Sequence, residues 1–128
     1  MVSIDQAMCR LRRITLIVSQ KIITVHPFHV KLQVEVVDPS TLVPLDFDTI
    51  MASVEKTGRV VVADECHQSC GVAAELVARI AESGFDKLKA PIRMVVRLDV
   101  PVPCSQLLDE AISPAEERIV DAIHATVD

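Results

Sequence analysis

The chain of 128 residues is half hydrophobic, with a mean hydropathy of +0.37, and its formal net charge is −5. The charge is uneven, because residues 1–33 hold five Lys and Arg against one acid, whereas residues 34–128 hold eight against seventeen acids. An acidic body without Trp or Tyr lacks the basic grooves and stacking rings that nucleic-acid-binding proteins use, so we exclude that class of partner.

Length and cysteine content predict a single cytoplasmic domain, residues 1–128. A chain of this length buries enough surface to fold without disulfides, and its four cysteines favour a reducing compartment. The longest early apolar run, residues 14–18, is too short for a signal-peptide core or a membrane span. The high apolar content predicts exposed surface that a partner covers.

The rest of the chain is organised around residues 58–75, GRVVVADECHQSCGVAAE. The apolar run at residues 60–63 is typical of a strand buried on both faces of a parallel sheet. Two carboxylates follow, and a polar loop then leads into a helical pattern over residues 72–83, which Gly84 ends. Because ligands of open parallel sheets meet the loops at the carboxyl ends of strands, any chemistry should lie near residues 64–70.

Three further strands are predicted over residues 14–18, 34–37 and 92–96. A helix is predicted before Gly58, with Asp46 as its N-cap. The buried stripe of this helix consists of apolar residues spaced at i, i+3, i+4 and i+7, namely Phe47, Ile50, Met51 and Val54.

The C-terminal part combines an extended segment with a final helix. The segment DVPVP, residues 99–103, cannot be helical because its two prolines exclude that conformation. Ser113 and Glu116 form a capping-box pattern, with Pro114 at the first helical position. The order of elements predicts an α/β fold, a three-layer α/β/α sandwich with a mostly parallel sheet of four to five strands.

The connection over residues 20–33, QKIITVHPFHVKLQ, is hard to reconcile with this fold. A parallel pair of strands usually needs a helical crossover, but four β-branched residues in a row and Pro27 oppose a helix. We expect an extended segment or a distorted helical turn here.

From residue 34 onward the chain resembles the C-terminal domain of the transketolase superfamily. It is most similar to the β subunit of thiamin-diphosphate-dependent 2-oxo acid dehydrogenases. The resemblance is carried by VEVVDPSTLVPLDFDTIMASVEKTGRVVVADE, by GVAAELVARIAESGFDKLKAPIRMV and by DVPVPCS with the closing helix. The variant DECHQSCGVAAE resembles acetoin-dehydrogenase-type subunits. Residues 1–33 are atypical, and Cys104 stands where the family usually has Tyr or Phe.

The resemblance implies an accessory domain of the β subunit of an E1 component, serving subunit association and docking of the acyltransferase component. The partners would be the E1 α and β subunits and the subunit-binding domain of the E2 component. Thiamin diphosphate and magnesium are implied for the parent enzyme only, and no catalytic, cofactor-binding or metal-binding residue is implied for this chain. We expect the isolated chain to be inactive and to form a homodimer through residues 100–105 or the last helix.

Acidic residues follow several of the predicted strands. Asp38, Asp64, Glu65 and Asp99 could gather at one edge of the sheet and hold a cation or meet a basic partner, which would make the chain a free-standing binding module. Alternatively, each accepts backbone hydrogen bonds within its own loop. The candidate contact residues are Asp64, Glu65, Asp99, Val100, Pro101, Val102 and Pro103.

A second alternative depends on Cys66, His67 and Cys70. Two thiols and an imidazole provide only three ligands, and no second ligand pair accompanies them, so a metal site would be incomplete. The two cysteines could instead form a reversible disulfide in a thiol redox protein, or they could be ordinary loop thiols.

Overall fold

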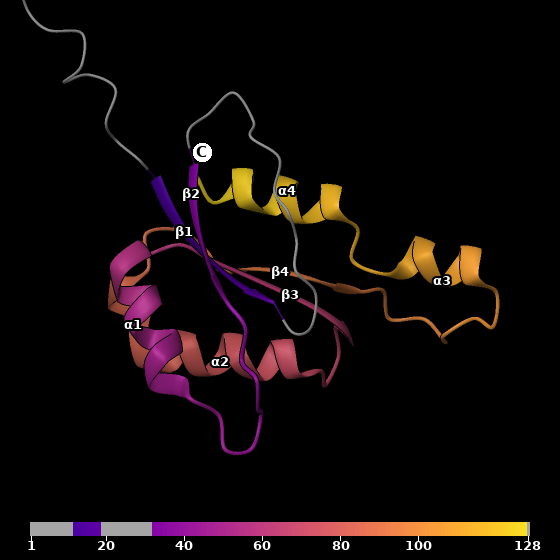
Figure 1. Ribbon diagram of the computed structural model, residues 1–128, viewed down its shortest axis with the longest axis horizontal. Helices are drawn as coiled ribbons and strands as arrows, with labels where there is room; N and C mark the ends of the chain where they lie inside the picture. Colours follow the sequence, from indigo (N-terminus) through magenta and orange to yellow (C-terminus); the bar gives the residue numbers. More distant parts are fainter. Residues whose placement is uncertain (1–11, 19–31, 128) are drawn as a thin grey trace, which may run out of the picture.

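The computed structural model describes residues 12–18 and 32–127. In chain order the elements are β1 (Arg12–Val18), β2 (Leu32–Val37), α1 (Phe47–Thr57), β3 (Val60–His67), α2 (Val72–Gly84), a 3-10 helix (Phe85–Lys87), β4 (Arg93–Arg97), α3 (Gln106–Ile112) and α4 (Glu116–Ala125). The strands form one parallel sheet in the order β2-β1-β3-β4 (Figure 1). The predicted strands therefore all form, with ends that differ from the expectation by at most four residues.

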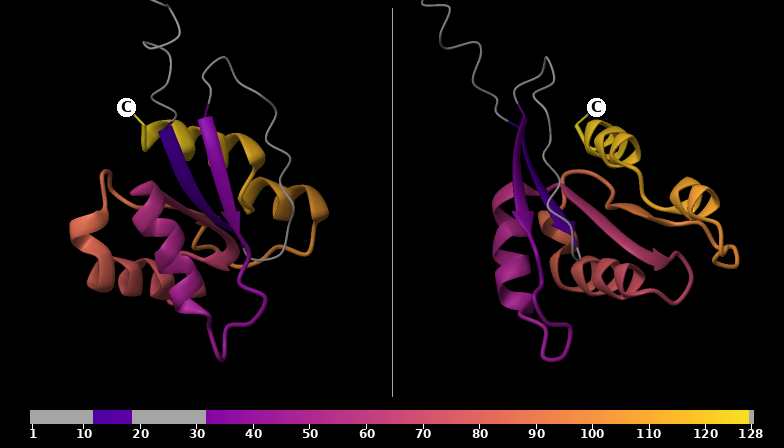
Figure 2. Two further views of the ribbon diagram at one scale, coloured as in Figure 1. Left: turned by 60° about the vertical axis from the view of Figure 1, so that its left-hand side comes forward. Right: turned by 45° about the vertical axis from the view of Figure 1, so that its right-hand side comes forward.

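Helices cover both faces of the sheet. α1 and α2 pack on one face, and α4 packs on the other (Figures 1 and 2). α3 projects beyond the ends of β3 and β4 (Figure 1). The described residues thus confirm the predicted three-layer α/β/α fold with a parallel sheet.

β3 joins the two hydrophobic cores. Successive side chains of a strand point to opposite faces of the sheet. Val60 and Val62 enter the core formed with α1 and α2, whereas Val61 and Ala63 enter the core formed with α4. All four are at most 3% exposed, so the prediction of a strand buried on both faces is confirmed.

Both predicted ends of α1 are confirmed. The Asp46 side chain accepts a hydrogen bond from the backbone N–H of Thr49 at 3.1 Å, which satisfies one of the free donors at the start of the helix. Gly58 adopts the left-handed conformation with φ of 69° and donates its N–H to the carbonyl of Val54 at 2.7 Å.

The end of α2 differs from the expectation. Gly84 is the last residue of α2 rather than a left-handed stop, with φ of −142°, and the chain continues directly into the 3-10 helix. Glycine is favoured here by close packing, because a Cβ atom at this position would lie 2.6 Å from Cε of Met51 in α1. A packing requirement of this kind has no local signature in the sequence.

The start of the last helix also differs from the expectation. α4 begins at Glu116, its N-cap is Ala115, and no side chain caps it. Ser113 instead ends α3, which the sequence did not predict, and its hydroxyl donates to the carbonyl of Asp109 at 2.8 Å. The apparent capping box fails because the preceding helix already uses its serine.

The irregular connection predicted for residues 20–33 lies largely outside the described residues. Its last two residues, Leu32 and Gln33, belong to β2. The expectation for residues 20–31 therefore stays a prediction.

We predict that Ile123→Ala lowers the free energy of unfolding by about 2–5 kcal/mol, because this α4 side chain is 2% exposed and its truncation leaves a cavity in the core. The matched control is Leu107→Ala in α3, where a side chain that is 78% exposed should contribute within about 0.5 kcal/mol. Urea unfolding followed by circular dichroism at micromolar protein measures both. Equal small effects would show that α4 is not a structural layer.

Candidate interaction surface beyond the strand ends

β3 continues through the acidic residues that were expected to follow it. Asp64 and Glu65 lie inside the strand, which ends at His67. Their carboxylates suggested a loop, but the backbone stays extended. The pairing of β3 with β4 changes register here, since Ala63 pairs with Val95 and the next pair is His67 with Arg97. The extra residues on β3 form a bulge, a feature that re-aims side chains at a sheet edge.

The four acids that could have gathered at one edge of the sheet are not brought together. β1 lies between β2 and β3, so Asp38 after β2 is separated from Asp64 and Glu65 in β3 by a strand. Within residues 12–18 and 32–127, no group of three or more His, Cys, Asp or Glu side chains is arranged to hold a metal ion. The acids therefore do not form a shared cation site in this part of the chain.

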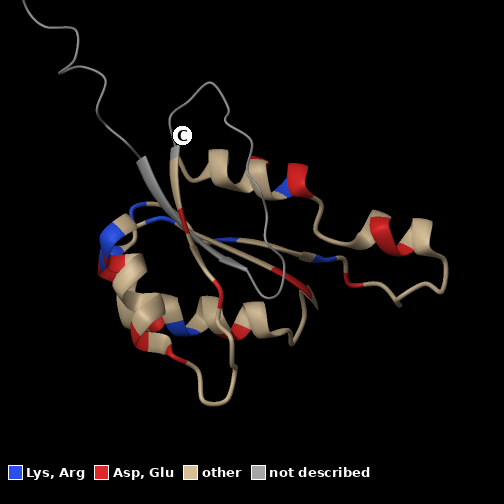
Figure 3. Cartoon of the chain, viewed as in Figure 1, with Lys and Arg blue, Asp and Glu red and all other residues tan. Residues whose placement is uncertain are grey.

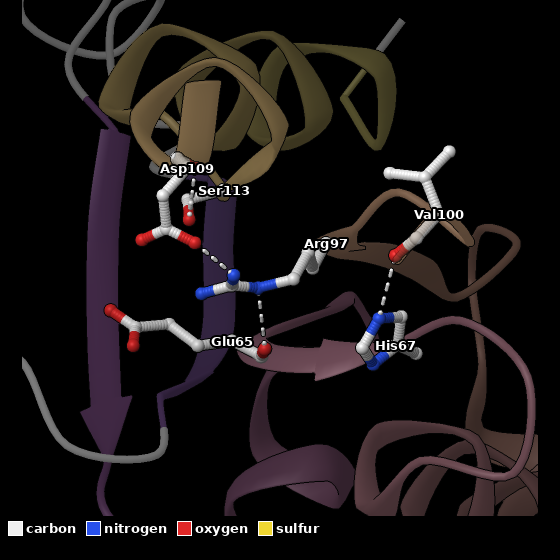
Figure 4. A network of polar contacts seen from close by, with 6 residues as sticks. All are labelled: Glu65, His67, Arg97, Val100, Asp109 and Ser113. Atoms are coloured by element: carbon white, nitrogen blue, oxygen red, sulfur yellow. Dashed lines mark hydrogen bonds and ion pairs between the residues drawn. The ribbon is translucent and has the colours of Figure 1, made fainter. Parts of the chain in front are cut away.

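Asp99 accepts hydrogen bonds from the loop after β3 rather than from its own loop, so it does not match the alternative expected for these acids. Its carboxylate accepts the backbone N–H of Ser69 at 3.1 Å and the hydroxyl of the same serine. These bonds, the hydroxyl first, lower the pKa of Asp99 below its ordinary value. The neighbouring Nε2 of His67 lies 3.1 Å from the carbonyl of Val100 (Figure 4). The loop after β3 thus holds the extended segment after β4.

Arg97 connects three elements. It lies at the end of β4, its Nε donates to the carbonyl of Glu65 in the β3 bulge at 3.2 Å, and its terminal nitrogen pairs with Asp109 of α3 (Figure 4). The side chain of Arg97 is 11% exposed and that of Asp109 is 38% exposed, so the guanidinium is largely shielded from water while the carboxylate is partly solvated. Arg97 is not among the residues predicted from the sequence; its only signal there is a basic residue at the end of the strand sequence RMVVR.

Residues 98–112, which we call the projecting segment, display apolar side chains. No residue of α3 is buried. Its Leu107 is 78% exposed, an unusual degree for a large aliphatic side chain in a structured helix. The other exposed large apolar residues of the segment are Leu98, Val100, Val102 and Leu108. Contiguous apolar exposure marks interaction surfaces in soluble proteins.

Of the candidate contact residues, five lie together on this segment. Asp99, Val100, Pro101 and Val102 are exposed and Pro103 is half-buried. Glu65 is exposed and Asp64 is half-buried in the β3 bulge. Acidic residues also lie along α3, in α4 and at the end of β3 (Figure 3). Residues 98–121 contain six acids against one arginine, so an apolar surface is combined with negative charge.

Cys66 lies in β3 and Cys70 in the loop that follows it, and the two thiols are not joined in a disulfide. Cys66 is half-buried, and burial is the main reason that the pKa of its thiol is raised. A raised pKa lowers the fraction of thiolate, which is the reactive form. Cys66, Cys70 and the exposed Cys104 are free thiols. Gly71 lets the loop fold tightly over Cys66, because a Cβ there would lie 2.5 Å from its Sγ.

Comparison with known proteins identifies the family to which this fold belongs. A family model described as "Transketolase, C-terminal domain" matches residues 29–119, more than two thirds of the chain. The chain belongs to the transketolase C-terminal domain family. No helix in the described part of the chain is long and apolar enough to cross a membrane.

Its curated relatives include β subunits of dehydrogenases. The acetoin:2,6-dichlorophenolindophenol oxidoreductase subunit beta of Bacillus subtilis is 40% identical over 89 residues, 70% of this chain and 26% of that protein. The subunit of the same name from Cupriavidus necator is 42% identical over 96 residues, 75% of this chain and 28% of that protein. The pyruvate dehydrogenase E1 component subunit beta of Porphyra purpurea is 42% identical over 89 residues, 70% of this chain and 27% of that protein. The chain thus spans about a quarter of the length of these relatives.

We predict a pH-dependent contribution of Asp99 to stability. Because the pKa of Asp99 is lowered in the folded state, its contribution is present above the ordinary value of 3.8 and is lost as the pH falls through the folded value. The urea midpoint of Asp99→Ala should therefore lie below that of the wild type at pH 6 and converge with it below pH 3.8.

Ser69→Ala is the matched partner variant for this experiment, since it removes the hydrogen bonds of the hydroxyl. It should reproduce part of the loss at pH 6, and the double variant should lose less than the sum of the two single variants. Strict additivity at pH 6, or a difference between Asp99→Ala and wild type that persists unchanged below pH 3.8, would contradict the assignment.

Proposed function

We propose that the chain is an assembly domain of the β subunit of a thiamin-diphosphate-dependent 2-oxo acid or acetoin dehydrogenase. The observation that carries the proposal is an exposed apolar segment on a domain whose family relatives are β subunits of such enzymes. The domain contributes surface to a larger oxidoreductase and no reacting group. This assignment places the protein in the cytoplasm.

The proposed partners are the E1 α and β subunits and the subunit-binding domain of the acyltransferase component. The projecting segment supplies the contact, from Asp99 to Pro103 and along α3, and Asp64 and Glu65 flank it. Apolar residues at the centre of an interface supply most of the burial, while surrounding charges select the partner. The negative charge of residues 98–121 favours partners with basic surfaces.

The cofactor of the parent enzyme does not fit the described residues. A diphosphate held through magnesium needs several oxygen ligands around the ion, and the described part of the chain offers no cluster of three carboxylate, imidazole or thiol groups for this purpose. We therefore assign thiamin diphosphate and magnesium to other parts of the parent enzyme.

We predict no saturable binding of thiamin diphosphate by the isolated chain in the presence of magnesium, because residues 12–18 and 32–127 offer no ligand set for the metal–diphosphate group. Isothermal titration calorimetry is the measurement, with magnesium alone as the control titration. Saturable binding with a dissociation constant in the micromolar range, about −8 kcal/mol, would contradict the assembly-domain proposal.

We predict that the isolated chain forms a homodimer through the projecting segment rather than through the last helix. The apolar stripe of α4 is committed to the core, since Ile119 and Ile123 are buried. In a two-fold dimer one patch meets itself. Sedimentation equilibrium and light scattering up to about millimolar protein detect even an association of about −4 kcal/mol.

Leu107→Ser with Leu108→Ser should weaken this association at least about tenfold, because both side chains are exposed and their burial is the driving force. Val43→Ser is the control, since Val43 is 93% exposed but lies outside the projecting segment. A strictly monomeric wild type would contradict the homodimer, and an equal loss in the control would place the contact elsewhere.

A further inference from the structure

α3 is a helix that cannot be stable on its own. It contains seven residues, whereas isolated helices shorter than about 12–15 residues are marginal in water. Its N-cap, Ser105, makes no side-chain capping bond, and none of its residues is buried. A hydrogen bond of 2.9 Å from Gln106 to Glu110 along its surface adds only a small stabilisation. Contacts outside the helix must therefore hold it in place.

The residue that ends the helix, Ser113, is contacted by Arg118 of α4, whose terminal nitrogen donates to its carbonyl at 3.4 Å. Among the described residues, two polar contacts join residues 106–112 themselves to the end of β4 and the residue after it. One is the backbone bond from the N–H of Leu98 to the carbonyl of Ile112, at 3.1 Å, which anchors the last residue of the helix. The other is the ion pair of Arg97 with Asp109. The ion pair is the side-chain contact that acts on the middle of α3, so it is the contact that decides the position of the helix.

A second hydrogen bond orients the Arg97 side chain toward Asp109. Its Nε is already bound to the Glu65 carbonyl at 3.2 Å, and Figure 4 shows the guanidinium between that carbonyl and the Asp109 carboxylate. A side chain fixed by a second bond loses less entropy when it forms an ion pair, and a shielded guanidinium interacts more strongly than an exposed one. The pair therefore differs from a surface pair in which both side chains are exposed, which contributes little, although the Asp109 carboxylate is partly solvated.

We propose that α3 is a hinged helix whose order is set by the Arg97–Asp109 ion pair. With the pair formed, α3 is helical and presents Leu107 and Leu108; without it, α3 unwinds while both hydrophobic cores stay intact. Water then solvates the Arg97 guanidinium in place of Asp109, so the loss of the pair changes the structure of α3 alone. Arg97 is a positioning residue for α3, and this inference concerns the helix itself, whether or not the domain acts in assembly.

Amide hydrogen exchange of the full chain, read by mass spectrometry, tests the proposal. Asp109→Asn should raise the exchange rates of residues 106–112 at least about tenfold and leave those of residues 60–63 within twofold. Asp109→Glu keeps a carboxylate and should recover part of the protection. Glu110→Gln is the matched control, because it removes a charge from the same helix but keeps an oxygen acceptor for Gln106; it should change exchange less than about twofold.

Each other outcome overturns the proposal. If Asp109→Asn leaves the exchange of residues 106–112 unchanged, the ion pair does not hold α3. If it raises exchange in residues 60–63 as much as in α3, the pair stabilises the whole fold and α3 is not a hinged unit. If Glu110→Gln has the same effect as Asp109→Asn, the cause is the net charge of the helix rather than the pairing with Arg97.

Discussion

The burial of β3 on both faces is the constraint on which the rest of the structure depends. Val60 and Val62 pack with α1 and α2, while Val61 and Ala63 pack with α4. A strand that contributes to two cores ties their stabilities together, because each core loses part of its wall if the strand moves. Residues 61–63 of β3 are also paired on both sides, with β1 and with β4, so the buried part of the strand is held within the sheet.

The two halves of this strand differ in composition and in burial. Its first half is apolar and buried, and its second half is a polar bulge. In the bulge, the carbonyl of Glu65 accepts a hydrogen bond from Arg97 at the end of β4. In the loop after the bulge, the N–H of Ser69 donates to Asp99, which follows β4. Polar contacts hold the projecting segment without burying its apolar residues. Those residues remain available for a partner, which is the property that an assembly domain needs.

The sequence predicts what local chemistry determines and misses what distant contacts determine. The buried run at residues 60–63, the Asp46 cap and the Gly58 end of α1 were predictable because each depends on neighbours within a few positions. α3 was missed because seven residues without a cap or a buried stripe carry no helical signal. The ion pair that holds it, and the continuation of β3 past its acidic residues, depend on Arg97, which is distant in sequence from the bulge it stabilises.

The account predicts that the two cores unfold together and that the projecting segment opens separately. Pulse-labelling with deuterium at increasing urea, followed by mass spectrometry of peptides from α1, α4 and α3, measures this directly. Peptides of α1 and α4 should lose protection at the same urea concentration, because β3 joins their cores, and α3 should lose protection at a lower one. Loss of protection in α4 well before α1 would contradict the central role of β3.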